Sequence, residues 1–438
     1  MGAVLLLERG GGDWLTSGPY HVLRSAGERG VPFQRASAAL PPEIAFLRTE
    51  GVAERLLIRT AADAAQAGTD AATALLNAGL MEEAAYYRAL ARALGAPYLD
   101  GSIPFGPGLC FPGTVVSGLA MLAPGSVAPW VLAPRGRVIA ALLDGRRPAG
   151  PAAITSPTHL REAVFAAIPA QVADYAAHDR ARCAPERATA REPAVWRLLV
   201  LALVSIAGLC LCAALPAPIA GAVVLAAQSL FLAMTTVRLA AVAIAAPVTV
   251  EVPPLTDAAL PVYTILVPLY REAAVVPALL RALAALDYPP AKLDIKLLIE
   301  AGDPETAAVL APIPLPARFE VITVPPGTPR TKPRALNAGL PLARGNLLTV
   351  FDAEDDPDPG QLRLAAALFA RLPERTACLQ GRLVIDNADD SWLTRAYALE
   401  YAGLFDVLNP ALAQCRLPVP LGGTSMHLRG LMEQMHHS

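Results

Sequence analysis

Acidic side chains are concentrated in one short stretch of the sequence, TVFDAEDDPDP (349–359). It overlaps the apolar run NLLTVF (346–351), which is typical of a strand buried in a parallel sheet, and ligands of such sheets bind beyond the carboxyl ends of the strands. Carboxylates that converge there repel one another unless a cation lies between them. Because hard oxygen ligands suit Mg²⁺ or Mn²⁺, we predict a divalent-metal site formed by Asp352, Glu354 and Asp355.

Asp356 and Asp358 in the same stretch have a simpler explanation. The segment DDPDP favours the positive end of a helix dipole, and Pro357 suits the first turn of a helix. We therefore expect these two aspartates to be solvated residues at a helix N-terminus.

Three further segments carry polar residues where predicted strands end or where the next helix begins: VPLYRE (267–272), LIEAGDPET (298–306) and TKPRALNAG (331–339). Since strand ends of a doubly wound sheet face one crevice, these residues are expected to converge. Asp303 has a structural alternative, because Asp-Pro-Glu-Thr is also a good helix N-cap. No Gly-x-x-x-x-Gly-Lys-Ser/Thr loop is present, which excludes a P-loop nucleotide site. The candidates are Pro268, Tyr270, Glu272, Glu300, Asp303, Lys332 and Asn337.

The elements that must position these residues alternate from about residue 260 onward. Short apolar runs alternate with segments of helical periodicity, which predicts an α/β domain with a doubly wound, mostly parallel sheet and helices on both faces. The expected strands are 262–270, 293–302, 319–326 and 346–351, and the expected helices are 272–289, 303–313 and 332–345.

The order of these motifs resembles the catalytic domain of family 2 glycosyltransferases, the inverting group that includes cellulose and chitin synthases. The matching pieces are TILVPLYRE, LIEAGDPET, TKPRALNAGL, TVFDAEDDPDPGQLR, CLQGRLVIDN and PLGGTSMHLR. The resemblance implies a GT-A fold over residues 258–438 and a nucleotide-diphosphate sugar donor, with UDP as the expected nucleotide.

The resemblance also implies roles for the candidate residues. Tyr270 and Glu272 would border the base and ribose, and Asp303 would contact the uracil. Lys332 would approach the diphosphate. The metal-binding Asp-x-Asp of the family falls on Asp352 and Glu354, with Asp355 beside them, and the acceptor side would be lined by Gly422, Gly423 and Thr424.

The general base that inverting transfer requires is not found in this sequence. The family's Thr-Glu-Asp motif is absent, as are the Gln-x-x-Arg-Trp motif and the later membrane helices of the processive synthases. Glu400 and Asp406 fall in a predicted helix and are poor substitutes. We expect either a truncated product of a longer gene or a donor-binding relative without normal transfer.

Composition predicts a membrane protein. Of 438 residues, 54% are hydrophobic and 17% are charged, and the mean hydropathy is +0.42. Two apolar runs, 198–215 and 219–237, are separated by Pro-Ala-Pro, which predicts two transmembrane helices within 197–246. Arginines precede the first run and follow the second, which places both flanking domains in the cytoplasm of an inner-membrane, multi-pass protein. They are Arg180, Arg182, Arg187, Arg191, Arg197 and Arg238.

The N-terminal half is expected to hold a flexible leader (1–45), a small α/β domain (46–178) and a basic linker (179–196). Within the small domain, residues 128–145 predict two short strands around a turn, and SPTHLREAVFAAI (156–168) predicts a capped helix. The domain resembles the N-terminal domain of type II secretion ATPases, whose relatives can bind cyclic dinucleotides, although their Arg-Leu-Gly element is not evident here.

Several other classes of function are excluded or disfavoured by the sequence. A net charge of −2 without a basic stripe argues against nucleic-acid binding. The six cysteines lack metal or disulfide spacing, and we expect His427, His436 and His437 to be non-catalytic.

The main hypothesis is a membrane-anchored inverting glycosyltransferase acting on a polysaccharide or lipid-linked acceptor. The alternative is a catalytically incomplete membrane module that binds a nucleotide or scaffolds partners through its N-terminal domain.

Overall fold

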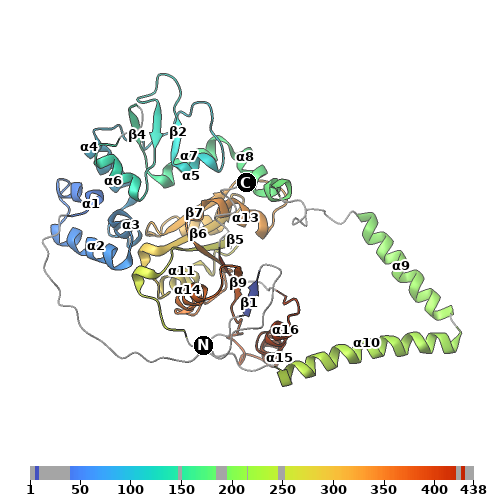
Figure 1. The fold of residues 1–438 in the computed structure, drawn as a ribbon. Helices are drawn as coiled ribbons and strands as arrows, with labels where there is room; N and C mark the ends of the chain where they lie inside the picture. Colours follow the sequence, from blue (N-terminus) through green and yellow to red (C-terminus); the bar gives the residue numbers. More distant parts are fainter. Residues whose placement is uncertain are drawn as a thin grey trace, which may run out of the picture.

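The computed structural model contains a seven-stranded sheet and a three-stranded sheet, each flanked by helices (Figure 1). The structure describes residues 5–8, 40–146, 150–183, 195–214, 216–244, 252–420 and 426–429.

The larger sheet is mixed, with strand order β1-β9-β10-β8-β5-β6-β7. Its parallel part pairs β5 with both β6 and β8, and β6 with β7, whereas β10 runs antiparallel between β8 and β9. The α/β class is confirmed, but the expectation of a mostly parallel sheet is corrected, because β9, β10 and β1 extend the sheet in the antiparallel sense. The strands are β1 Leu5–Glu8, β5 Tyr263–Leu269, β6 Leu293–Glu300, β7 Phe319–Val324, β8 Leu347–Val350, β9 Thr376–Gln380 and β10 Met426–Arg429.

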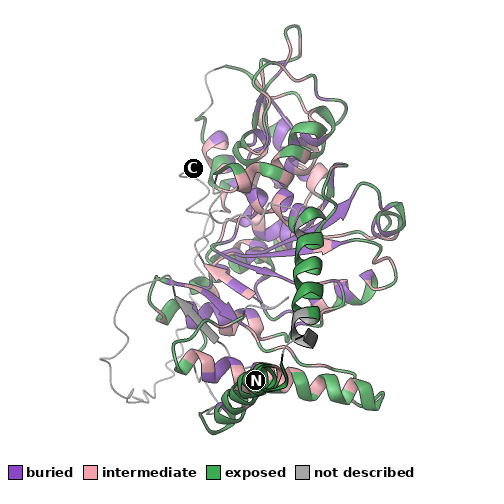
Figure 2. Ribbon diagram, turned by 90° about the vertical axis from the view of Figure 1, so that its right-hand side faces the viewer, coloured by how far each residue is buried: buried purple, intermediate pink, exposed green. Residues whose placement is uncertain are grey.

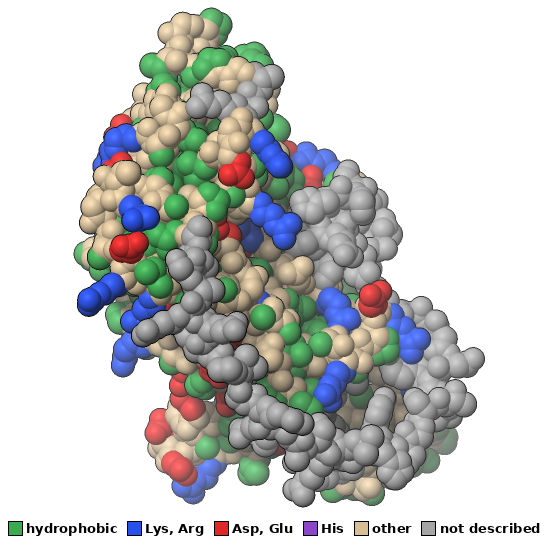
Figure 3. All heavy atoms as spheres, turned by 60° about the vertical axis from the view of Figure 1, so that its left-hand side comes forward, with side chains coloured by type: hydrophobic (Ala, Val, Ile, Leu, Met, Phe, Trp, Pro, Cys, Tyr) green, Lys and Arg blue, Asp and Glu red, His purple; other side chains and the backbone are tan. Residues whose placement is uncertain are grey.

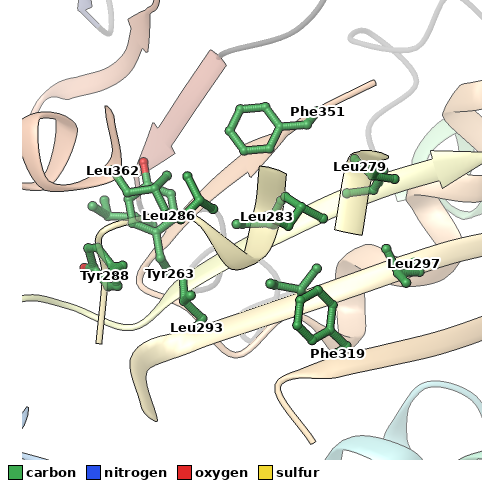
Figure 4. Close-up of a cluster of buried hydrophobic side chains, with 14 of the residues drawn as sticks. Tyr263, Leu279, Leu283, Leu286, Tyr288, Leu293, Leu297, Phe319, Phe351 and Leu362 are labelled. Carbon is green, nitrogen blue, oxygen red and sulfur yellow. The ribbon is translucent and has the colours of Figure 1, made fainter. Parts of the chain in front are cut away.

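The two faces of the parallel part are covered by different helices. Alternate residues of β5 point to opposite faces, as the two-residue period of a strand requires. Ile265 and Val267 pack with α11 and α14, and Leu266 packs with α13 and α8. Figure 4 shows the first of these cores around Tyr263, Leu283 and Phe351. The crossover helices are α11 Val276–Ala284, α12 Pro304–Leu310, α13 Lys332–Gly339 and α14 Gln361–Arg371.

The chain reverses its direction of winding between β5 and β8. From β5 the chain adds β6 and then β7 on one side, and it then returns to place β8 on the other side of β5. The carboxyl ends of β5 and β8 therefore flank a topological switch point, which is the usual ligand position in open α/β sheets.

The N-terminal half forms a small α/β domain. The three-stranded sheet has the order β2-β3-β4. Ser156 caps α7 as predicted, since its side chain accepts a hydrogen bond from the His159 backbone N–H. The elements are α1 Pro42–Ala45, α2 Glu54–Ala67, α3 Ala71–Asn77, α4 Glu83–Leu94, α5 Gly113–Ser117, β2 Leu119–Met121, β3 Trp130–Leu132, α6 Arg137–Leu143, β4 Ala152–Ile154, α7 Pro157–Ala167 and α8 Pro169–Cys183.

Two predictions for this half are wrong. The second strand expected within residues 128–145 is the helix α6, because Ile139 and Leu142 are spaced to bury one helical face. The segment Leu5–Glu8, expected in a loose leader, pairs with β9 as β1, and Ile44 of α1 is fully buried in the small domain.

Two apolar helices connect the domains, α9 Val195–Ala214 and α10 Ala217–Ile244. Their described side chains are almost all exposed (Figure 2). Among the helices of the described ranges, α10 is long and apolar enough to cross a membrane, whereas the apolar stretch of α9, Leu198–Gly208, is shorter. The predicted two-helix hairpin is therefore not confirmed, and one candidate span is found.

The last helices of the described ranges lie at the carboxyl-terminal end of α10 (Figure 1). They are α15 Trp392–Ala402, the π-helical segment η6 Gly403–Leu408 and α16 Asn409–Gln414.

The N-terminal domain is joined to the larger sheet by buried polar contacts. Glu320 on the edge strand β7 forms ion pairs with Arg135 and Arg161 of the small domain, at 3.2 and 3.5 Å. The amide of Asn77 donates to the Leu293 carbonyl at 3.3 Å, and Arg318 donates to the Asn77 carbonyl at 2.6 Å. Over the surface shown in Figure 3, basic and acidic side chains are interspersed.

Candidate functional site

A pocket of about 440 Å³ opens at the carboxyl ends of β5 and β8, at the switch point of the larger sheet. It brings together side chains from the β5 loop, the N-terminus of α13 and the β8 loop. Its lining residues are Pro268, Leu269, Tyr270, Glu272, Glu300, Arg330, Thr331, Lys332, Ala335, Asp352, Ala353 and Glu354. Residues as far apart in the sequence as Pro268 and Glu354 thus meet, as the alternation of elements predicted.

The β5 loop takes its shape from a residue in the left-handed region. Arg271 has a φ of 61°, which is uncommon for a residue other than glycine. Its backbone N–H donates to Asp303 Oδ2 at 2.5 Å, and the Glu272 N–H donates to Thr306 Oγ1 at 3.1 Å. These bonds hold Tyr270 and Glu272 against the pocket from the start of α12.

Asp303 fixes this loop and does not line the pocket. It is 3% exposed and caps α12, accepting from the backbone N–H and the hydroxyl of Thr306 at 3.1 and 2.7 Å. Burial opposes its ionisation, but the hydrogen bonds from Arg271 and Thr306 hold the pKa of its carboxyl below the usual value. Asp303 is thus the helix N-cap that the sequence offered as the structural alternative.

Glu272 belongs to a group of carboxylates with mutual repulsion. Desolvation raises the pKa of Glu272, and the charges of Glu354, Asp303 and Asp352 raise it further. Glu272, Asp352 and Glu354 line the same pocket. The site therefore concentrates negative charge and favours a cation.

The β8 loop presents Asp352 to the pocket by a tight turn. The Asp352 N–H donates to Asp355 Oδ2 at 2.7 Å, and the Asp355 N–H donates to the Asp352 carbonyl at 3.2 Å. Asp355, predicted as a metal ligand, therefore supports the turn and does not line the pocket. The ammonium of Lys332 forms an ion pair with Asp352 Oδ1.

A buried ion pair holds helix α13 to the end of strand β6. Arg334 pairs with Glu300 at 2.5 Å and also donates to the Pro325 carbonyl at 3.0 Å. Asn337, predicted to bind donor, points elsewhere and donates to the Ala176 carbonyl of α8 at 3.0 Å. This contact joins α13 to α8, a helix far away in the sequence, so the motif alone could not reveal it.

Two polar residues of the pocket were not predicted from the sequence. Arg330 and Thr331 precede α13 and line the pocket next to Lys332. The signal that could have found Arg330 is its position two residues before Lys332, at the entrance to the same helix N-terminus.

Other predicted residues lie elsewhere. Gly422, Gly423 and Thr424 fall outside the described residues. Glu400 is exposed on α15, and Asp406 pairs with Arg382 at 2.6 Å.

Two further predictions concern His427 and Pro357. His427 is buried, with its ring nitrogens next to the Tyr263 hydroxyl and the Gln361 amide, and burial lowers its pKa to about 4. Pro357 does not enter a helix, because α14 begins at Gln361.

The residues present suit a divalent ion only in part. In the described ranges no group of three or more His, Cys, Asp or Glu side chains could hold a metal. However, Mg²⁺ is commonly bound through one or two carboxylates, with substrate phosphates completing its shell. Asp352 and Glu354 fit that smaller role, and the repulsion at Glu272 is what a cation would relieve.

Comparison with known proteins gives the class. Residues 261–429 match the family model described as "Glycosyltransferase like family 2". The "Probable glycosyltransferase YdaM" of Bacillus subtilis (strain 168) is 27% identical over 143 residues, which cover 32% of this chain and 34% of that protein. A "Beta-monoglucosyldiacylglycerol synthase" of Trichormus variabilis is 30% identical over 142 residues, covering 32% and 30%. The chain thus matches about a third of the length of these curated relatives.

Solved structures show weaker likeness. A mannosyltransferase from Pyrobaculum calidifontis, in complex with GDP-Man and Mn²⁺, is 23% identical with a TM-score of 0.28, over 35% of this chain and 45% of that one. S. aureus TarS 1-349 in complex with UDP-GlcNAc is 21% identical with a TM-score of 0.22, over 25% and 31%. TM-scores this low carry no argument about the site.

The family match and the order of elements agree on one class. Residues 261–429 match the model of a glycosyltransferase family, and the curated relatives are named as glycosyltransferases, so the predicted enzyme class is confirmed.

Proposed function

We propose that this chain binds a nucleotide-diphosphate sugar in the switch-point pocket and transfers the sugar, with inversion, to a polysaccharide or lipid-linked acceptor. One observation carries the proposal. Side chains from the β5 loop, the α13 N-terminus and the β8 loop line a single pocket inside the glycosyltransferase domain. UDP is the expected nucleotide, from the motif resemblance.

The side chains divide into two sets by charge. The ring of Tyr270 is 46% exposed at the pocket and offers an apolar face to a nucleotide base, with Glu272 beside it to accept from ribose hydroxyls. Lys332 and Arg330 offer cationic groups to the diphosphate, and the α13 N-terminus points the same way.

In the free protein, the Lys332 charge is shared with Asp352. Donor binding would exchange that partner for phosphate oxygens, which leaves Asp352 and Glu354 free to hold Mg²⁺ or Mn²⁺. When bound, such an ion supplies electrostatic stabilisation of the leaving diphosphate. The described residues are assigned donor binding, and none is assigned as the general base.

The same proposal includes a membrane location. The helices α9 and α10 would both enter the inner membrane, so that the chain returns to its starting side, and the arginines near the two apolar runs favour the cytoplasmic side for the N-terminal and glycosyltransferase domains. The acceptor would then be met at the inner leaflet.

The N-terminal domain is not favoured as a cyclic dinucleotide site. A pocket there of about 100 Å³ is lined by apolar side chains, among them Leu94, Leu132 and Ile154. Ligand pockets are usually several hundred Å³ and include polar groups that orient the ligand. A pocket of about 320 Å³ where this domain meets β7 includes the side chains of Arg161 and Glu162, but Arg161 is paired there with Glu320. We therefore propose a packing role for this domain.

Nucleotide binding tests the proposal directly. The full chain, purified in detergent, is titrated with UDP and separately with GDP, each with and without Mn²⁺, by isothermal titration calorimetry. We expect Mn²⁺-dependent binding of one nucleotide, weakened about 10- to 100-fold by Asp352→Ala, as for other losses at a metal site.

The matched control is Asp356→Ala. Asp356 is exposed in the same loop and does not line the pocket, so its loss should leave the affinity unchanged. An equal loss of nucleotide affinity in both variants would contradict the assigned site. So would binding that depends neither on Mn²⁺ nor on Asp352.

A further inference from the structure

The cationic wall of the pocket is formed by one short segment, which comprises the loop before α13 and the first turn of that helix. Arg330, Thr331, Lys332 and Ala335 line the pocket from this segment, and the carboxylates of the β8 loop line the same pocket. The spacing between the cationic and the acidic groups therefore depends on what fixes α13.

Helix α13 packs both on the larger sheet and on α8, the last helix of the N-terminal domain (Figure 1). Its approach to the sheet is close, since a Cβ at Gly339 would lie 2.6 Å from Leu298 Cδ2 of β6. From α8, Val172 and Ala176 are fully buried in the same apolar cluster as Ala338 of α13. Helix α13 is thus held in place by both domains.

One side of α8 contacts both parts of the segment that forms the cationic wall. The Asn337 amide of α13 donates to the Ala176 carbonyl at 3.0 Å. Ala173, about one turn earlier on α8, lies against the loop before α13, because a Cβ at Gly327 would be 3.2 Å from the Ala173 Cβ. The same Cβ would be 2.7 Å from Arg334 Nη1, so this loop passes between Arg334 and α8.

We propose that α8 positions the cationic wall of the donor pocket, and that Asn337 is a positioning residue that acts through Lys332 and Arg330. If α13 shifted away from α8, both cationic groups would move relative to the diphosphate oxygens, and charge-assisted hydrogen bonds depend on distance and alignment. The base side of the pocket would stay in place, because its loop is held by Asp303, the N-cap of α12. The inference rests on the proposed donor site.

The contact can be removed without leaving a buried acceptor unpaired. The Ala176 carbonyl lies inside α8, where helix geometry gives it a second donor, the backbone N–H four residues later. Asn337 is half-buried, and leucine has nearly the same size and shape. Asn337→Leu therefore removes one hydrogen bond and keeps the packing, whereas Ala173→Leu presses on the loop from α8.

Nucleotide affinity tests the inference. The full chain in detergent is titrated with UDP and separately with GDP, in the presence of Mn²⁺, by isothermal titration calorimetry. We expect Asn337→Leu to weaken binding several-fold, and Ala173→Leu to do the same from the α8 side. The matched control is Ala170→Leu, at an exposed position of α8, which should leave the affinity unchanged. In a Lys332→Ala background, Asn337→Leu should cost less affinity than it does in the wild-type chain, because the two residues act together.

The possible outcomes separate the two proposals. Wild-type protein that binds neither nucleotide overturns the donor site and this inference with it. Wild-type protein that binds, while Asn337→Leu and Ala173→Leu bind equally well, overturns the inference alone. An equal loss in Ala170→Leu also overturns it, as does a loss in Asn337→Leu that is undiminished when Lys332 is already replaced, since a general weakening of the fold would produce both.

Discussion

At the scale of single residues, the pocket holds carboxylates that repel one another. Glu272, Asp352 and Glu354 share one pocket, and the structure offsets part of their charge through Lys332. The remaining repulsion appears in the raised pKa of Glu272, which desolvation and the neighbouring carboxylates cause. Such groupings destabilise the free protein and become favourable when a cation is present.

Replacing Glu272 by glutamine should therefore stabilise the free protein. Because its pKa is raised on folding, the wild type is most stable below the unfolded value near 4.5 and loses stability as pH rises through the folded value. We expect Glu272→Gln to gain about 1 kcal/mol at neutral pH, and nothing below about pH 4. Thermal unfolding over this pH range measures the difference, with Glu305→Gln, an exposed carboxylate on α12, as control. A gain that persists in acid would refute the electrostatic cause.

At the scale of elements, the switch point depends on the close approach of β8 to β5. Gly345 lies just before β8, and its N–H donates to Thr264 Oγ1 at 2.8 Å. A Cβ at this position would lie 2.4 Å from the Thr264 nitrogen and 2.8 Å from the Val262 carbonyl oxygen. Since both are backbone atoms, they cannot move aside without disturbing the strand pair.

Gly345→Ala is thus expected to destabilise the protein by about 1–3 kcal/mol or more, through overpacking. Gly302→Ala is the matched control, because a Cβ there would have no atom within 4 Å. Urea unfolding of the two variants should differ clearly. If both behaved alike, the steric argument for the β5–β8 pair would be wrong.

At the scale of the whole molecule, the N-terminal domain and the larger sheet are joined through buried charges. Glu320 pairs with Lys296 of β6 and with Arg344 of the loop before β8, at 2.8 and 2.5 Å, as well as with Arg135 and Arg161 of the small domain. Desolvation opposes its ionisation, but these four cations hold the pKa of Glu320 well below its usual value. The small domain is therefore held to the glycosyltransferase domain by direct ion pairs, in addition to the chain that connects them.

This interface should weaken in acid. A lowered folded pKa gives stability that is present above the unfolded value near 4.5 and is lost as pH falls toward the folded one. Glu320→Gln should remove that dependence and cost about 3–5 kcal/mol, since four buried or half-buried cations lose one carboxylate partner and Arg135 has no other ion pair among the described residues. Hydrogen exchange in β7 and α7 against pH measures both effects. Glu162→Gln, an exposed neighbour of Arg161, should leave exchange unchanged, and a similar response would show that Glu320 is not the link.

Much of the catalytic half could be predicted because its signals are local. Apolar runs and helical periodicity identified β5, β6, β7, β8 and the helices between them, and the polar residues at strand ends identified most of the pocket. The helix α6 was missed because a short apolar run fits a strand and a helix equally well.

By itself, the sequence determined the order of the elements, the class of enzyme and the group of carboxylates after β8, because each depends on residues that are neighbours in the chain. The tertiary structure decided which candidates reach the pocket: Asp303 and Asn337 are engaged by Arg271 and by the carbonyl of Ala176. It also decided that the sheet is mixed, with β9, β10 and β1 joined to it by antiparallel pairs. These features depend on contacts between segments far apart in sequence, and no local pattern records them.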